Sequence, residues 1–557
     1  MNASDRTQIR RNRVLFENRR ELAPTKLRAA CMDTGFETTL RMQRLTGEIE
    51  SGPLPPLLPL PADTSARTYK ATDAFFAALD ALLVAVAAAN AGPTRTSRIA
   101  YLWFTGVAGA CNWVRDAPGR MTGTHDGWSW DIRRPLYDAR HTAVLRQIWL
   151  IAAIEVLAPS FTPTFDTDPL RTATRTALGI SSADYDTLET FVRSTGHFDE
   201  WRAAWNAWYA ARQLDGFVAA SAPRNPATDF PNGTTVLDVA ATVDPGTFPQ
   251  PSKWTPLKVG VKTQNYLTFN WRDVTSSGLT HEDETAIEGA ASAAFPASDA
   301  ERTAEIAEVV AITAGLSDAQ KVSAEFWAGG PFTVSPPGMF LWFWRMYVDA
   351  IKLQNMDVLL CSGLDVAQHL FETGRMVWGV KKTFLQARPL QEIRRLYRGT
   401  MLTKYDGTPI DGSAWVPYQE LNFVTPPFAD FPSGHSAFSK SFANVMSEWF
   451  GPTIDAKPTT LTSLRLLSPA FAGVDSQTTA FGHITFPAGA SLIQPSVVPA
   501  APIEFVWTTW ADMATSAGVS RKYGGIHATS AHVGSVALAD ALHAALRARV
   551  GLRVDVQ

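Results

Sequence analysis

Three short segments in the second half of the chain combine basic, hydroxyl and imidazole side chains at fixed spacing. The first, VKKTFLQARP at 380–389, places Lys381 and Arg388 seven residues apart. Seven residues are about two helical turns, so this spacing predicts that both cations leave one face of a helix that ends at Pro389. A solvated basic face would also explain these charges, because further lysines and arginines lie close by in the sequence.

The second segment, PSGH at 432–435, has two interpretations. Ser433 is a favoured helix N-cap, and the run 437–450 that follows has helical periodicity, so a simple helix start explains it. Alternatively, the hydroxyl of Ser433, the bare backbone N–H of Gly434 and the imidazole of His435 converge at the positive end of that helix. Such a group of donors would make an anion cradle.

The third segment, SRKYGGIHATSAH at 520–532, separates Arg521 from His527 by a Tyr-Gly-Gly turn. Alone, this histidine is explained as a cap or a core residue, and the glycines as a helix C-cap. Together, the three segments supply positive charge, a hydroxyl and a backbone N–H, which suit a tetrahedral oxyanion. The residue types alone leave the central atom of this oxyanion open.

In this order, Lys-x6-Arg-Pro, Pro-Ser-Gly-His and Ser-Arg-x5-His resemble the three-part signature shared by vanadium-dependent haloperoxidases and their acid and lipid phosphatase relatives. Trp378 and Phe428 look like the aromatic residues on the halide side of the pocket in chloroperoxidase-type members. The segment EFWAGGPFTVSPPG at 325–338 resembles the stretch before the active-site bundle of soluble haloperoxidases. The resemblance covers roughly residues 300–550, and the N-terminal half shares only its helical character.

The resemblance implies a role for each matching residue. Vanadate is expected to be the cofactor, with phosphate in its place when vanadate is absent. His527 would be the vanadium ligand, His435 the acid–base group that takes a proton from hydrogen peroxide, and Lys381 a catalytic cation that polarises the peroxide. The oxyanion would be bound by Lys381, Arg388, Ser433, Gly434, Arg521 and His527, and halide would lie near Trp378 and Phe428.

The implied enzyme is a vanadate-dependent haloperoxidase that oxidises bromide or iodide with hydrogen peroxide and halogenates small organic molecules. Algal bromoperoxidases usually carry histidine where this chain has Phe428, so chloride oxidation also stays open. One alternative is an acid phosphatase that uses His527 as the nucleophile. It is disfavoured by the chain length, Trp378 and the segment 325–338. A second alternative is a non-catalytic helical protein that binds an oxyanion for stability.

Two departures from the family pattern concern the residues around the site. Many members have an acidic residue a few positions after the metal-binding histidine, and here that position holds Ala531. Relatives also commonly have an aspartate near the AGG segment that pairs with the second arginine, and here Ala328, Gly329 and Gly330 occupy that place. The partners of Arg521 and His527 are therefore sought elsewhere, with Glu325 and Asp512 as weak candidates.

Apolar residues at three- and four-residue spacing predict helices over most of 68–218, 300–327, 339–388 and 506–548. The expected fold is all-α, two helical bundles with loop-rich insertions and minor β hairpins, one of them in TAFGHITF at 479–486. The predicted divisions are an N-terminal extension (1–66), an N-terminal bundle with a loop-rich insertion at 219–280 (67–299), and a C-terminal bundle with the vanadate site (300–557). The roles of 219–280 and of a second insertion, 452–503, are left open.

Composition limits the possible partners. Of the 557 residues, 46% are hydrophobic and 18% charged, and the net charge of −3 indicates no general attraction to nucleic acid. The start of the sequence lacks a signal-like apolar segment and no stretch resembles a membrane span, which predicts a soluble, cytoplasmic protein; non-classical export and homo-oligomerisation stay open. Cys31, Cys111 and Cys361 predict neither a disulfide framework nor a CxxC metal site, and favour a reducing compartment. The other eight histidines show no metal-site spacing and are expected to be structural or surface residues.

Overall fold

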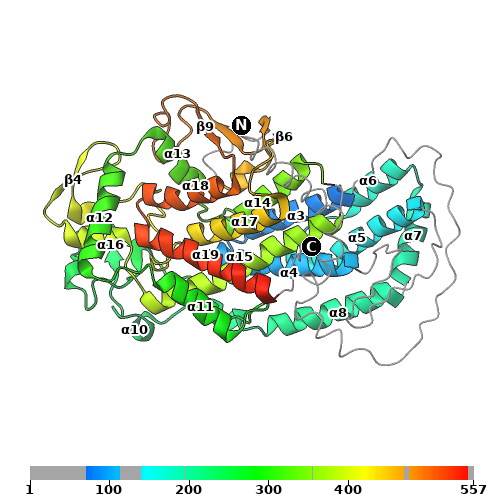
Figure 1. Cartoon of the computed structure of the whole chain (residues 1–557), viewed down its shortest axis with the longest axis horizontal. Helices are drawn as coiled ribbons and strands as arrows, with labels where there is room; N and C mark the ends of the chain where they lie inside the picture. Colours follow the sequence, from blue (N-terminus) through cyan, green and yellow to red (C-terminus); the bar gives the residue numbers. More distant parts are fainter. Residues whose placement is uncertain are drawn as a thin grey trace, which may run out of the picture.

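A computed structural model describes residues 71–549 apart from 113–138, 195, 354–355, 469–473 and 475. Helices dominate the described part and the strands are short and peripheral, so the all-α prediction is confirmed (Figure 1). The predicted extension 1–66 lies outside the described residues. None of the described helices combines the length and apolar composition that crossing a membrane requires.

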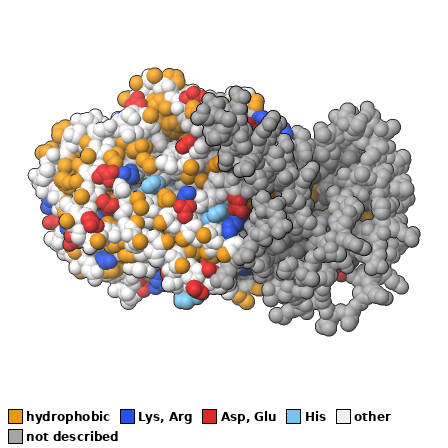
Figure 2. Space-filling model, in the orientation of Figure 1, with side chains coloured by type: hydrophobic (Ala, Val, Ile, Leu, Met, Phe, Trp, Pro, Cys, Tyr) orange, Lys and Arg blue, Asp and Glu red, His pale blue; other side chains and the backbone are white. Residues whose placement is uncertain are grey.

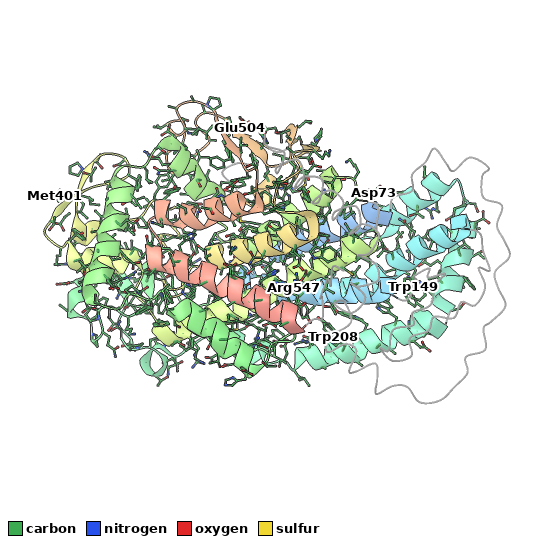
Figure 3. All side chains as sticks on the ribbon, viewed as in Figure 1. Asp73, Trp149, Trp208, Met401, Glu504 and Arg547 are labelled. Carbon is green, nitrogen blue, oxygen red and sulfur yellow. The ribbon has the colours of Figure 1, made fainter. Side chains whose placement is uncertain are left out.

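The N-terminal helices run from the centre of the molecule, where the first two lie, to one end (Figure 1). They are α3 (Ala71–Ala88), α4 (Gly92–Asn112), α5 (Ala139–Phe161), α6 (Asp168–Leu178), α7 (Ser182–Ser194) and α8 (Gly196–Gln213). Trp149 of α5 contacts Phe198 of α8 edge-on, with ring centroids 5.1 Å apart, and Figure 3 shows Trp149 and Trp208 within this end. The end of the region 68–218, which was predicted to be mostly helical, thus contains two separate helices, α7 and α8.

The insertion 219–280 is mostly loop, as predicted. It contains the short helices α9 (Phe217–Ser221) and α10 (Pro226–Asp229) and the strands β1 (Leu237–Asp238), β2 (Leu257–Val259) and β3 (Lys262–Thr263). Strand β2 pairs parallel with β1 and antiparallel with β3. Helix α11 (His281–Ser292) follows. Its N-cap Thr280 and its N3 residue Asp283 form a capping box, in which each side chain bonds to the backbone N–H of the other.

The second half supplies the helices that carry the predicted site. They are α12 (Asp299–Ala314), α13 (Asp318–Phe326), α14 (Ser335–Ala350), α15 (Met356–Phe384), α16 (Pro389–Leu396), α17 (Gly434–Phe450), α18 (Trp510–Tyr523) and α19 (Thr529–Arg549). Helix α17 packs against α15, α18 and α19 in the centre of the molecule (Figure 1). Its buried face includes Phe438, Phe442 and Met446, which follow the four-residue spacing of a helix stripe.

The remaining strands form three two-stranded sheets. Strands β4 (Met401–Thr403) and β5 (Pro409–Asp411) make one hairpin. Strand β6 (Pro458–Thr460) pairs with β7 (Thr478–Ala480), and β8 (His483–Phe486) pairs with β9 (Ile503–Val506). The predicted hairpin within 479–486 is therefore wrong in its pairing. The two strands exist on either side of a Phe-Gly turn, but each finds its partner elsewhere in the chain.

A single hydrophobic cluster runs from Phe75 on α3 to Leu546 on α19. Gly363 allows α15 to pack closely against α4. A Cβ at this position would collide with the rings of Phe104 and Trp344. The predicted division at 299/300 stays a prediction, since this cluster includes residues from both sides of it. A smaller cluster joins the insertion, α12 and α16 through residues such as Leu257, Ile306 and Leu390.

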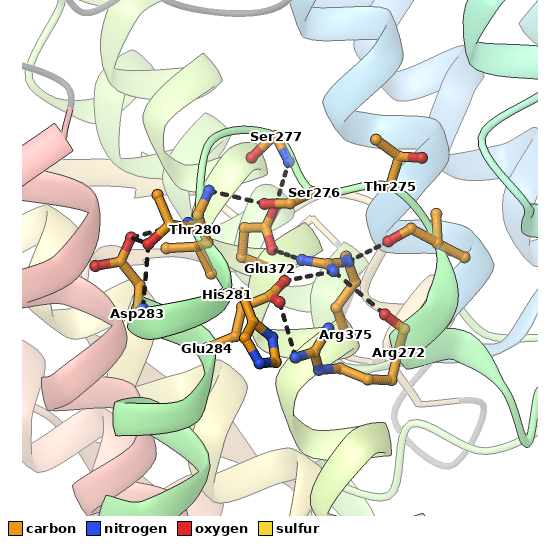
Figure 4. Close-up of polar contacts among 12 residues, drawn as sticks. Arg272, Thr275, Ser276, Ser277, Thr280, His281, Asp283, Glu284, Glu372 and Arg375 are labelled. Carbon is orange, nitrogen blue, oxygen red and sulfur yellow. Dashed lines mark hydrogen bonds and ion pairs between the residues drawn. The ribbon is translucent and has the colours of Figure 1, made fainter.

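A buried ionic network ties the end of the insertion to the middle of α15 (Figure 4). Glu372 accepts from the Ser277 backbone N–H and forms an ion pair with Arg375, at 2.5 Å each. Arg375 also pairs with Glu284 of α11 at 2.7 Å, and Arg272 pairs with the same carboxylate at 2.8 Å. Because these groups are buried, each charge is stabilised by its partners rather than by water.

On the face shown in Figure 2, acidic and basic side chains of the described part are interspersed. Cys361 of α15 is disulfide-bonded. The expectation that the chain has no disulfide is therefore wrong at this residue, because separation in sequence does not report proximity in a fold. The cysteines consequently give no support for a reducing compartment.

Candidate active site

The two cations of the first segment do not share a helix. Helix α15 ends at Phe384, Leu385 has a left-handed φ of 46°, and Arg388 is the N-cap of α16, whose first residue is Pro389. The prediction of one helix reaching Pro389 is therefore wrong, because the left-handed residue breaks it four positions earlier. The side chains still meet: Lys381 Nζ and Arg388 Cζ lie 5.1 and 5.0 Å from the centroid of the Phe428 ring.

Lys381 and Arg388 both fix the loop 428–430. Lys381 Nζ donates to the carbonyl oxygens of Ala429 (2.6 Å) and Asp430 (3.0 Å). Arg388 Nε donates to the Phe428 carbonyl at 2.7 Å. Both side chains are buried, so the alternative of a solvated basic face is excluded for these two residues.

The PSGH segment begins α17, and the cap interpretation of Ser433 is confirmed. Its hydroxyl accepts from the Ser436 backbone N–H at 3.4 Å, and its own N–H donates to the Ala531 carbonyl at 2.9 Å. Gly434 is the first helical residue, so its N–H has no acceptor within the helix. A cap and an anion cradle are therefore compatible at this helix start.

His435 lies one residue further on and is almost fully buried. Its Nε2 is 2.6 Å from the Trp327 carbonyl oxygen, which can only accept, so Nε2 carries the proton. A Cβ at Gly329 would come within 3.5 Å of Nε2, which places the AGG segment beside this imidazole. Burial, followed by the charges of Arg521 and His527, holds the pKa of His435 well below its usual range. The neutral ring therefore keeps a lone pair on Nδ1.

Arg521 and His527 approach from the end of α18 and the turn after it. Arg521 donates from Nε to the Ser520 hydroxyl at 3.0 Å and from its NH2 group to the Ala324 carbonyl. His527 Nδ1 lies 2.6 Å from Asp430 Oδ1, and its Nε2 lies 3.1 Å from the Arg388 NH1 group. The three sequence segments thus meet in one buried site.

The carboxylate beside His527 is Asp430, which the sequence analysis missed. Glu325 instead accepts from the Tyr418 hydroxyl at 2.6 Å and the Leu492 N–H at 2.8 Å, and Asp512 accepts from the Thr508 hydroxyl. Neither weak candidate touches Arg521 or His527 through these bonds. The signal for Asp430 was its position in FADFPSGH, three residues before the N-cap of α17.

Electrostatics within the site favour an anion. Burial lowers the pKa of Arg388 to about 10, that of Arg521 to about 9 and that of Lys381 well below its usual range. Burial likewise lowers the pKa of His527 to about 3. Although burial alone would raise it, Arg302 and His527 hold the pKa of Asp430 well below its usual range. Within the described part of the chain, Asp430 is the carboxylate whose charge acts on Lys381, Arg388 and His527, so one carboxylate faces several basic groups.

The predicted halide-side aromatics are neighbours. Trp378 and Phe428 have ring centroids 4.9 Å apart at an interplanar angle of 52°. The Trp378 indole N–H donates to the Leu267 carbonyl at 2.8 Å, which fixes the ring. A Cβ at Gly434 would lie 4.0 Å from Trp378. The structure therefore places both aromatic rings beside the cradle residues.

The insertion 219–280 is hydrogen-bonded to the backbone of the site. The Tyr266 hydroxyl oxygen accepts from the Ala429 N–H at 3.2 Å, and the Leu267 N–H donates to the Pro427 carbonyl at 2.9 Å. The Trp254 N–H donates to the Leu385 carbonyl at 2.6 Å, close to the break after α15. The insertion is thus hydrogen-bonded both to the segment that carries Lys381 and Arg388 and to the loop that these two cations fix. The second insertion contributes Ser491 and the Leu492 N–H as donors to Glu325 on α13.

The donor set fits an oxyanion. Among the described residues, one terminal nitrogen of Arg388 and one of Arg521 are buried without any hydrogen-bond partner. Buried guanidinium N–H groups are costly to leave unsatisfied, and an oxyanion would satisfy them. Vanadate fits because it is an anion, whereas a bare metal cation would be repelled by these charges. Within the described part, no three His, Cys, Asp or Glu side chains gather as a cation site.

The fold and this site define a class: helical-bundle proteins in which buried cations and a histidine gather at a helix N-terminus. Residues 364–551 match the family described as the VCPO second helical-bundle domain. No curated protein matched the sequence.

Solved structures extend the similarity to most of the chain. A holo-type bacterial vanadium-dependent chloroperoxidase matches with a TM-score of 0.53 and 17% identity, over 83% of this chain and 93% of that one. Its apo-type structure gives 0.54 and 17%, over 82% and 95%. The first bacterial vanadium-dependent iodoperoxidase gives 0.52 and 13%, over 86% and 96%. The chain therefore has the vanadium haloperoxidase fold, and the resemblance seen in the three motifs is confirmed at that level.

Proposed function

We propose that the protein is a vanadate-dependent haloperoxidase that uses hydrogen peroxide to oxidise bromide or iodide. The observation that carries this proposal is that Lys381, Arg388 and Arg521 are all buried beside the two histidines. Arg388 lies 3.1 Å from His527, the charge of Lys381 also acts on His527, and the charge of Arg521 acts on His435. The family match and the fold support it, because the similar solved structures are vanadium-dependent chloro- and iodoperoxidases.

Each residue has a task that follows from its contacts. Arg388 and Arg521 offer their unpartnered N–H groups to the oxyanion, and Ser433 and Gly434 add a hydroxyl and a helix-start N–H. His527 offers Nε2 as the ligand atom, since its Nδ1 is engaged with Asp430. Bound vanadate supplies a Lewis-acid centre that polarises peroxide without a change in oxidation state.

Proton transfer falls to His435. Its Nε2 proton is held by the Trp327 carbonyl, so Nδ1 is the atom that accepts a proton from incoming hydrogen peroxide. Lys381, whose Nζ is held by the Ala429 and Asp430 carbonyls, would add a third positive charge to the site and would stabilise negative charge that develops on the peroxide oxygens.

The halide would be oxidised beside Trp378 and Phe428. Hydrogen peroxide, halide and one proton give a hypohalous acid and water. The hypohalous acid then replaces a hydrogen of an electron-rich organic molecule with halogen and releases a second water. Bromide and iodide are the proposed substrates, because chloride is harder to oxidise.

One assay separates this proposal from its rivals. The purified protein is loaded with orthovanadate and assayed for bromination of a phenolic dye with peroxide and bromide, and separately for p-nitrophenyl phosphate hydrolysis. We expect bromination that depends on vanadate and is abolished in His527→Ala. Phosphate hydrolysis without bromination would overturn the proposal in favour of an acid phosphatase with His527 as nucleophile. Inactivity in both assays would favour a non-catalytic oxyanion-binding protein.

A further inference from the structure

We propose that Asp430, held in place by Arg302, is the positioning residue that orients His527 as the vanadium ligand. This inference rests on the proposed function. Position 531, where the sequence analysis looked for an acidic residue, holds Ala531. Asp430, in the loop before α17, would orient His527 instead, with Arg302 of α12 holding it in place.

Asp430 is fixed at all four of its polar groups. Its Oδ1 faces His527 Nδ1 at 2.6 Å, and its Oδ2 accepts from Arg302 at 2.9 Å. Its backbone N–H donates to the Gln386 carbonyl at 3.0 Å, and its carbonyl accepts from Lys381 at 3.0 Å. With the side chain fully buried, the carboxylate has one orientation available.

Arg302 is itself anchored. The nitrogen that binds Asp430 also donates to the Ala387 carbonyl at 2.8 Å, one residue before Arg388. Arg302 is buried at the N-terminal end of α12 and lies 3.5 Å from Glu305. It therefore links the loop of Asp430 to the segment of Arg388.

The orientation of Asp430 decides the tautomer of His527. A carboxylate only accepts, so His527 must donate from Nδ1, and its lone pair is then on Nε2. Nε2 faces the Arg388 NH1 group at 3.1 Å, within the site. A carboxylate behind a metal-bound imidazole also raises its basicity, and losing such a partner typically costs about 10–100-fold in metal affinity.

Helix α12 also secures the chain on the far side of His527. Glu305 accepts from the Ser530 N–H and hydroxyl, and Glu308 accepts from Thr529 and Lys522. These bonds fix the start of α19 without any acidic side chain at position 531, where Ala531 is fully buried.

The sharpest test is Asp430→Asn, because Arg302 dictates how the new amide must lie. Arg302 needs an acceptor, so the amide oxygen will face it and the amide nitrogen will face His527 Nδ1. That nitrogen donates, which forces the proton of His527 onto Nε2, where the ligand lone pair is needed. We expect vanadate affinity, measured by vanadium-51 NMR titration, to fall by about 10–100-fold.

Two further measurements identify a positioning role. Inorganic phosphate makes no bond to the imidazole, so its affinity should change much less than that of vanadate. Proton–nitrogen NMR of the histidine rings should show His527 protonated on Nδ1 in the wild type and on Nε2 in Asp430→Asn. Equal losses for both oxyanions would indicate simple disruption of the site and overturn the inference. So would an unchanged tautomer.

Glu325→Gln is the matched control, since Glu325 is also a buried carboxylate with several side-chain hydrogen bonds but none to the site. It should bind both oxyanions as the wild type does. If Asp430→Asn does not fold, Arg302→Gln keeps the carboxylate and should give a smaller selective loss of vanadate affinity. A wild type without bromination but with the tautomer switch would sink only the proposed function. Bromination with unchanged vanadate affinity in both variants would sink only the present inference.

Discussion

His435 donates from Nε2 to the carbonyl oxygen of Trp327 across 2.6 Å, just beyond the end of α13. This bond fixes both the ring and its tautomer. Burial and the nearby charges of Arg521 and His527 keep the pKa of His435 well below its usual range. The imidazole is therefore neutral at ordinary working pH, with Nδ1 ready to accept a proton.

The first prediction concerns this proton acceptor. His435→Ala should leave vanadate affinity within about threefold, because the three cations and His527 are untouched. Peroxide-dependent bromination should fall by about 10²–10⁴-fold, the usual contribution of a general base. Steady-state turnover of the vanadate-loaded variant checks this, with the exposed His281→Ala as control. Full turnover in His435→Ala would show that another group takes the proton.

The second prediction tests the fork geometry of Arg521. Arg521→Lys keeps the positive charge but loses the planar donor set, of which one buried nitrogen has no partner among the described residues. Hydrogen bonds to charged groups contribute about 1.5–3 kcal/mol, so vanadate and phosphate should both bind at least about tenfold more weakly. Calorimetric titration measures this. Arg465→Lys, an exposed position, serves as the control and should bind both as the wild type does.

The third prediction concerns the support from the insertion. Tyr266→Phe removes the acceptor of the buried Ala429 N–H and should lower the free energy of unfolding by about 1–3 kcal/mol. It should also weaken oxyanion binding, because Ala429 belongs to the loop that Lys381 holds. Denaturant unfolding and phosphate titration measure the two effects. Tyr101→Phe, a buried tyrosine stacked on Phe371, should leave phosphate affinity unchanged.

The sequence predicted which residues form the site better than how the backbone positions them. The three motifs, taken in order through their resemblance to a known family, were enough to predict that Lys381, Arg388, Ser433, Arg521 and His527 lie together. The break after α15 was missed because it depends on one left-handed residue, Leu385. A left-handed position is usually indicated by glycine or asparagine, and this one holds neither.

The partners of the site were harder to predict because they come from distant parts of the chain. Arg302 and Tyr266 precede Lys381 by 79 and 115 residues, and nothing in the sequence next to either residue indicates a role in the site. The all-α fold followed from helical periodicity, which is local. The pairing of β7 and β8 with other strands depends on contacts with distant parts of the chain, which the eight residues 479–486 alone do not reveal.

The fourth prediction separates folding from binding at Gly434. Its φ is not left-handed, and a Cβ there would meet only Phe438 and Trp378 at ordinary contact distances of 3.7 and 4.0 Å. Gly434→Ala should therefore fold with a melting temperature close to that of the wild type. Because the methyl group would stand beside Trp378, we expect weaker bromide use, seen as a raised KM for bromide. A large loss of thermal stability would contradict this packing.

The fifth prediction concerns pH and a histidine far from the oxyanion. His543 of α19 is half-buried, and its Nδ1 lies 3.2 Å from His369 Nε2. Asp365, Glu448 and Arg547 surround the pair, and Figure 3 shows Arg547 at the end of α19. Burial, followed by the charges of His369 and Arg547, lowers the pKa of His543 to about 3.

The sign of the resulting pH effect follows from proton counting. In the unfolded chain His543 takes up a proton near pH 6.5, and in the folded protein only near pH 3. Between these values the unfolded state binds more protons, so stability falls as the pH falls. His543→Gln removes this contribution, and the gap in melting temperature between wild type and variant should narrow from about pH 7 to about pH 4.5. The pKa of Asp365 is held below its usual range, so that carboxylate titrates mainly below this window. A gap that stays constant on acidification would show that His543 is protonated in the folded protein as readily as in the unfolded one.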